Sequence, residues 1–197
     1  MGHIVSFFIA VMVAAFAAWF QYKNWKKQDR VRVEEKEQEI ASQLISEFAR
    51  LASKRLFRQK RYFWSLQSDS CINEERKRYN DILHEWNESF TDMLSRFEYS
   101  FGKGTASFIE NNVQARFYEM HGKINDMRNE GVESLDVEGI EEGLNYLGGL
   151  ISSTSKGLRE RVREKRFSIL TSYEVISFSN RKNLSLGFLL ARLFGLH

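Results

Sequence analysis

The fold is decided by residues 79–101, which read YNDILHEWNESFTDMLSRFEYSF. Apolar and aromatic side chains recur in this stretch at steps of three and four residues, which places them on one face of an α-helix. The residues on that face are Tyr79, Ile82, Leu83, Trp86, Phe90, Met93, Leu94, Phe97 and Phe101. Such a face must be covered by other elements, so we expect several helices packed together.

Three further stretches repeat this spacing. They cover residues 40–56, 109–127 and 140–162, and short polar or glycine-containing connections separate them. Four amphipathic stretches with short connections are typical of an antiparallel four-helix bundle. The sequence therefore predicts an all-α protein built around such a bundle.

Turn and capping residues indicate where these helices begin and end. We expect the first turn at residues 67–73, with Asn73 as the N-cap of the second helix. Gly102 ends that helix, and Ser134 or Asp136 begins the fourth. The fourth helix is rich in glycine, which predicts a close approach to a neighbouring helix or a local bend.

The chain of 197 residues contains no proline and one cysteine. Proline makes up about 5% of average sequences and interrupts helices, so its absence favours long helices. Between Gly2 and Gly102 there is neither glycine nor proline, and an N-terminal helix can therefore continue directly into the bundle. The lone Cys71 excludes a disulfide framework and fits a reducing compartment.

The N-terminal segment has the composition of a membrane-spanning helix. Residues 4–20 contain a single polar side chain, that of Ser6, and a span needs about 20 apolar residues. Basic residues follow the run and none precedes it, which predicts an uncleaved single-pass anchor in the cell membrane, with the N-terminus outside and the body in the cytoplasm. The expected lipid and topology residues are Trp19, Tyr22, Lys23, Trp25, Lys26, Lys27, Arg30 and Arg32.

These patterns divide the chain into four parts. We expect a transmembrane anchor at 1–22, a basic juxtamembrane segment at 23–33, the helical bundle at 34–166 and a tail at 167–197. Residues 184–196 of the tail are amphipathic and too short to span a bilayer. A bundle of four has no place for their apolar stripe, so we expect it to dock a partner. The stripe consists of Leu186, Leu189, Leu190, Leu193 and Phe194.

Basic residues gather at the ends of two of the expected helices. The first cluster comprises Arg50, Lys54, Arg55, Arg58, Lys60 and Arg61. The second comprises Lys156, Arg159, Arg161, Arg163, Lys165 and Arg166. Such charges can be a solvated helix face that complements the helix dipole, or a surface for an acidic partner protein or anionic lipid. Nucleic acid is the least favoured partner, because the net charge is only +3 and no nucleic-acid-binding motif is present.

Catalytic and metal-binding signatures are incomplete. Residues 153–156 match the S-x-x-K pattern of serine acyl-transfer enzymes, but the companion motifs are missing. Asp81 and His84 have the spacing of half a di-metal motif, with Asp in place of the usual Glu. We therefore expect no enzymatic activity, no cofactor and no metal.

The function that follows from these patterns is a membrane-anchored, non-enzymatic scaffold, adaptor or regulatory subunit. Its expected partners are the lipid bilayer and other proteins, and homo-oligomers are compatible with the pattern. The alternative is a membrane-acting effector or channel component that oligomerises through its anchor. A third hypothesis is a membrane tether for nucleic acid.

Overall fold

The computed structural model describes residues 2–130 and 136–164. Every element within these ranges is helical, which confirms the all-α class. The elements are α1 (Gly2–Ser68), α2 (Ile72–Phe101), α3 (Lys103–Phe108), the π-helical η1 (Ile109–Gln114), α4 (Ala115–Glu130) and α5 (Val137–Arg163). The chain divides into two units, Met1–Glu39 and Ile40–His197, and α1 contributes residues to both.

The described residues of the first unit, 2–39, form the N-terminal part of α1. The transmembrane helix expected at residues 1–22 is not confirmed: among the residues that the structure describes, no helix combines the length and the apolar character that crossing a bilayer requires. Residue 1 and the side chains of 2–8 and 10, which make up much of the apolar run, lie outside the described set.

The second unit, Ile40–His197, contains the rest of α1 and all the other helices. Ion pairs establish that α2 runs antiparallel to α1. Arg96 of α2 pairs with Glu47 of α1 at 2.8 Å, whereas Arg61 of α1 pairs with Glu75 of α2 at 2.9 Å. The partners are thus far apart in sequence at one end of the pair and close at the other.

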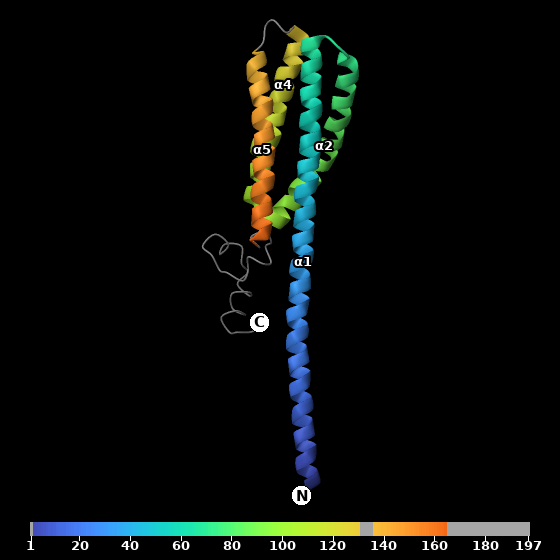
Figure 1. The fold of residues 1–197 in the computed structure, drawn as a ribbon, viewed down its shortest axis with the longest axis vertical. Coiled ribbons are helices and arrows are strands. Elements are labelled where there is room, and N and C mark those ends of the chain that lie inside the picture. Colours follow the sequence, from blue (N-terminus) through green and yellow to red (C-terminus); the bar gives the residue numbers. More distant parts are fainter. Residues whose placement is uncertain (1, 131–135, 165–197) are drawn as a thin grey trace. The chain divides into compact units, whose positions relative to one another are not determined.

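α5 is also antiparallel to α1. Lys60 of α1 donates to Asn145 Oδ1 of α5 at 2.7 Å, and Leu56, one turn earlier on α1, lies beside Gly148, about one turn later on α5. Successive long helices of this unit alternate in direction (Figure 1). The unit is therefore the helical bundle that the four amphipathic stretches predict.

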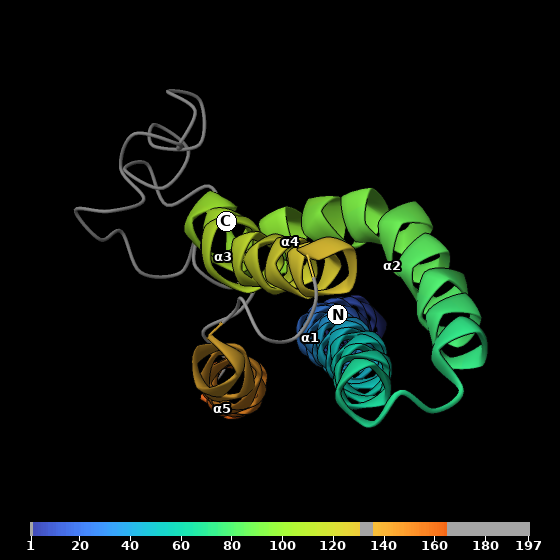
Figure 2. The same ribbon diagram turned by 90° about the horizontal axis from the view of Figure 1, so that it is seen from above.

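Within the bundle, α1 lies beside α2, α4 and α5 (Figure 2). Its contact with the η1–α4 segment is made through polar groups: Arg55 NH1 donates to Gln114 Oε1 at 3.1 Å, and Gln59 Nε2 donates to the Phe117 carbonyl at 3.4 Å. The part of α1 in this unit is therefore buried on several sides.

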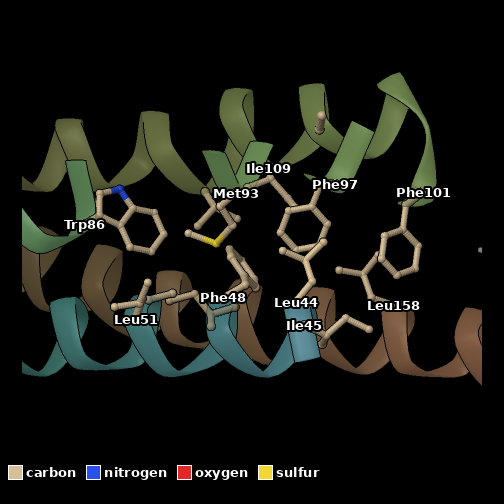
Figure 3. Packing of buried hydrophobic residues seen from close by; sticks show 14 of the residues in the cluster. Leu44, Ile45, Phe48, Leu51, Trp86, Met93, Phe97, Phe101, Ile109 and Leu158 are labelled. Carbon is tan, nitrogen blue, oxygen red and sulfur yellow. The ribbon is translucent and has the colours of Figure 1, made fainter. Parts of the chain in front are cut away.

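The aromatic stripe of α2 forms the centre of the main core. The Phe48 ring of α1 lies 6.4 Å from the Trp86 ring and 5.6 Å from the Phe97 ring, centroid to centroid. Figure 3 shows the Trp86 and Phe97 rings of α2 on the side of α1 that carries Leu44, Phe48 and Leu51. A second core cluster contains Tyr62, Phe63, Leu66, Tyr79, Ile82, Met120, Ile124, Met127, Ile140 and Leu144. Ile40, expected on the same face as Leu44, is instead 51% exposed, because burial on α1 begins at Ala41.

Two glycines of α5 lie where a neighbouring helix approaches closely. A Cβ atom at Gly143 would overlap the Met120 side chain of α4, and one at Gly148 would lie 3.3 Å from Leu56 Cδ2 of α1. The expectation of close helix packing is therefore confirmed at these two positions. At Gly149 and Gly157 a Cβ would meet nothing within 4 Å.

The caps agree with the sequence in part. Asp136 caps α5, since its Oδ1 accepts from the Gly139 amide at 2.8 Å. The N-cap of α2 is Cys71 in a left-handed conformation (φ 54°), so the prediction of Asn73 was wrong. The connection between α1 and α2 is shorter than expected and holds the left-handed Asp69 as well as Cys71. Gly102 ends α2 with φ 85°, which glycine adopts without steric cost.

Candidate binding groove and buried polar centre

A groove of about 650 Å³ lies between α1 and α5 within the bundle unit. Its apolar surface is supplied by residues such as Leu56, Phe57 and Ile151. Phe57 is 54% exposed, although it is a large aromatic residue. The volume is within the range of about 300 to 1,000 Å³ that is typical of ligand pockets.

The groove exists because small residues face each other across the two helices. Ala49 and Ser53 of α1 and Ser152 and Ser155 of α5 all line the groove. Side chains of this size leave the space between two helix backbones unfilled, whereas Leu or Phe at these positions would close it. The hollow is thus a consequence of the small residues of α1 and the serines of α5.

The rim of the groove is basic. Lys60, Lys156, Arg159 and Arg163 line it, together with the acidic Glu160. Three of these cations belong to the second basic cluster that the sequence shows. No ion pair joins these three to any residue within 2–130 or 136–164.

Most of the first basic cluster is paired with acids of α2. Lys54 Nζ lies 2.5 Å and Arg50 NH1 3.7 Å from the Glu85 carboxylate. Farther along, Arg58 and Arg61 approach the carboxylate of Glu75.

Glu75 is buried, and the hydrogen bond from Arg61 lowers its pKa against the opposing effect of burial. Arg78 of α2 shares the same carboxylate at 3.2 Å. Because Lys60 faces α5 while Arg58 and Arg61 face α2, the expected patch is divided over two sides of α1.

Arg55 does not belong to this surface at all, which corrects its expected place in the patch. Its side chain is completely buried, and its guanidinium lies 4.2 Å from the Phe117 ring and 5.4 Å from the Trp86 ring. Its NH1 donates to Gln114, while Nε and NH2 have no hydrogen-bond partner. Burial lowers the pKa of Arg55, but arginine keeps its charge at neutral pH.

Gln114 is the acceptor at the centre of this buried group. Its Oε1 accepts from both Trp86 Nε1, at 2.7 Å, and Arg55 NH1. Gln114 is the last residue of η1, and the wider π-helical turn there shifts the register of the side chains that follow. Neither Gln114 nor the π-helical turn was predicted from the sequence.

The expected lipid and topology residues lie on α1 in the first unit. Trp19, Tyr22 and Trp25 are exposed, and Lys23 lies over the Trp19 ring at 5.1 Å. The side chain of Arg30 lies outside the described residues, as does the whole tail with the stripe from Leu186 to Phe194.

No protein-family model matches this chain, and no curated protein or solved structure is significantly similar to it.

Proposed function

We propose that this protein is a non-enzymatic scaffold that is anchored in a membrane by its N-terminal segment and that holds a partner protein on its helical bundle. The observation that carries the proposal is the run of exposed apolar and aromatic side chains on α1 that is followed directly by cations. Met12, Phe16 and Trp19 are 74%, 69% and 54% exposed.

A lipid bilayer is the environment that best accounts for the exposed apolar side chains of this segment. Large apolar side chains in such number are costly to hydrate, since each favours burial by about 1.5 to 3 kcal/mol. Trp19, Tyr22 and Trp25 suit the interface at its end, and Lys23 and Lys26 suit anionic headgroups on the cytoplasmic side.

The native Cys71 gives a direct test of this topology. It is exposed and is the only cysteine in the chain. A membrane-impermeant maleimide should leave Cys71 unlabelled in intact cells and label it after permeabilisation. In a Cys71→Ser background, Gly2→Cys should be labelled in intact cells. Labelling of Cys71 from outside would contradict the proposed orientation.

The bundle supplies the groove for the partner. Its apolar floor and basic rim complement an amphipathic helix that carries Asp or Glu beside an apolar stripe. The chain's own tail is a poorer match, because Arg181, Lys182 and Arg192 give it the same sign of charge as the rim. We therefore assign the groove to a partner protein.

Photocrosslinking from adjacent positions tests the groove. Ser152 lines it, whereas Ser153 is exposed on the same helix but does not line it. A photoreactive amino acid at 152, and not at 153, should give an adduct in irradiated cells, and the crosslinked peptide should be an acidic amphipathic helix. Lys156→Glu should abolish the adduct.

Three outcomes of the same experiment count against the proposal. Equal yields from positions 152 and 153 would show random collision. A crosslink to residues 184–196 would show that the tail fills the groove. An adduct of twice the chain's mass would indicate a homo-oligomer.

A further inference from the structure

A second cavity, of about 350 Å³, lies at the end of the bundle where α1, α2 and α4 meet. Its lining comprises arginine, asparagine, tyrosine and histidine side chains together with one leucine, and none of the described residues that line it is a carboxylate. An anion is bound best where hydrogen-bond donors surround it and no carboxylate repels it.

The two arginines of this cavity are available to a ligand. Arg76 is half-buried on α2 and Arg128 is exposed on α4. Within the described part of the chain neither takes part in an ion pair, in contrast to Arg78, which binds Glu74 and Glu75. A guanidinium binds a phosphate through two parallel hydrogen bonds, and two such groups match a charge of about −2.

The wall of the cavity holds a buried hydroxyl without a partner. Tyr62 is 1% exposed, and its hydroxyl makes no hydrogen bond. Its ring stacks on that of Tyr79 with centroids 5.7 Å apart. A buried hydroxyl that lacks a partner has lost its hydrogen bonds to water without replacement, so a ligand oxygen that accepts from it would restore one of them.

A hydrogen-bonded chain holds the rest of the wall in place. Tyr79 OH lies 2.9 Å from His121 Nδ1, and Asn125 Nδ2 lies 2.9 Å from His121 Nε2. Both nitrogens of the imidazole are thus occupied, and His121 positions Tyr79 and Asn125.

The buried Arg55 adds positive charge behind this wall. Burial raises the pKa of Tyr79 and the charge of Arg55 opposes that shift. Burial lowers the pKa of His121, and Arg55 lowers it further. A bound anion would partly offset this buried charge.

We propose that this cavity binds the phosphate group of a phosphomonoester, with Arg76 and Arg128 as the charged ligands and the Tyr62 hydroxyl as a further donor. The site is separate from the groove between α1 and α5, and the proposal does not depend on the scaffold function. A soluble phosphomonoester and a lipid with a phosphomonoester headgroup carry the same recognised group.

Calorimetric titration of the full chain in nanodiscs of phosphatidylcholine, with inorganic phosphate at constant ionic strength, tests the site. Saturable binding is expected. Arg76→Gln and Arg128→Gln should each weaken it about tenfold or more, and Tyr62→Phe about three- to tenfold. Lys77→Gln, which removes the same charge from the adjacent position of α2 outside the cavity, should leave affinity within about twofold.

The melting temperature of each variant without phosphate separates loss of binding from loss of folding. Absence of saturable binding to the wild type would overturn the proposal, and so would an equal loss in Lys77→Gln and Arg128→Gln. Nanodiscs with phosphatidic acid, compared with phosphatidylglycerol of the same charge density, identify the source. Competition by phosphatidic acid alone assigns the site to a lipid headgroup, and no competition assigns it to a soluble phosphomonoester.

Discussion

The guanidinium of Arg55 lies 4.2 Å from the centroid of the Phe117 ring inside the bundle, and no carboxylate within residues 2–130 or 136–164 forms an ion pair with it. A buried cation that is stabilised mainly by aromatic faces and one amide is a costly feature, because desolvation of an ion amounts to several kcal/mol. The surrounding helices hold this charge in place.

Replacement of Arg55 by methionine should therefore not harm stability. Trp86 still donates to Gln114 Oε1, and an unbranched apolar side chain can fill the same space. We expect Arg55→Met to leave the free energy of unfolding unchanged or to raise it by about 1 to 4 kcal/mol. Arg55→Ala, which leaves a cavity, should lower it by about 2 to 5 kcal/mol. Urea denaturation measures both, and a large loss in the methionine variant would show that the cation stabilises the bundle.

Trp86 is the largest of the fully buried side chains that the structure describes. It is completely buried and its ring lies 5.3 Å from that of Phe117. Trp86→Ala should lower the free energy of unfolding by about 3 to 5 kcal/mol. Tyr99, on the same helix but 63% exposed, provides the control, and Tyr99→Ala should cost less than about 0.5 kcal/mol. Similar losses in the two variants would contradict the packing described here.

Alanine substitutions at two glycines of α5 should change the stability of the bundle in opposite directions. Gly143→Ala places a methyl group against the buried Met120, and overpacking of this kind costs about 1 to 3 kcal/mol. Gly149→Ala meets open space and should stabilise the helix by about 0.5 to 1 kcal/mol. Thermal denaturation distinguishes the two. Destabilisation by Gly143→Ala should be reduced when Met120 is also shortened to alanine.

His121 should make stability depend on pH. Its pKa is lowered by burial and by Arg55, so the unfolded chain, with a histidine pKa of about 6.5, binds the proton first as pH falls. His121 therefore makes its full contribution to the free energy of unfolding above about pH 6.5. This contribution is lost as the pH falls toward the lower pKa that His121 has in the folded state. In His121→Gln, the fall in unfolding free energy between pH 7.5 and 5.5 should be smaller than in the wild type. An identical fall would contradict a buried neutral imidazole facing Tyr79, Asn125 and the charge of Arg55.

The sequence predicted the bundle because its helices carry clear periodic stripes. On α2, Tyr79, Ile82, Trp86, Met93 and Phe97 are all buried as the spacing indicates. This agreement has a simple cause, since a helix can bury only one face and the apolar residues identify it.

The polar centre was harder to predict. Arg55 and Gln59 continue the buried stripe of α1 beyond Leu51 at steps of four residues, but their charge and polarity made them resemble a solvated face. Periodicity was the signal that could have identified them. The π-helical turn at Ile109–Gln114 changes that periodicity locally, so no regular pattern marks Gln114.

The cavities depend on tertiary geometry that no local pattern contains. The groove requires small residues of α1, Ala49 and Ser53, to come together with Ser152 of α5. The first basic cluster was visible in the sequence. Which of its residues pair with Glu75 or Glu85 of α2 and which face α5 depends on the rotation of α1 about its axis.

Alkaline carbonate extraction of membranes tests the central claim most directly. The full chain is expected to remain in the membrane pellet, and a variant without residues 2–22 is expected in the supernatant with a bundle that melts as before. A full-length chain in which residues 4–20 are all leucine should be retained like the wild type, because an apolar span of this length suffices. Release of the full chain by carbonate, or retention of the shortened chain, would contradict membrane anchoring by the N-terminal segment.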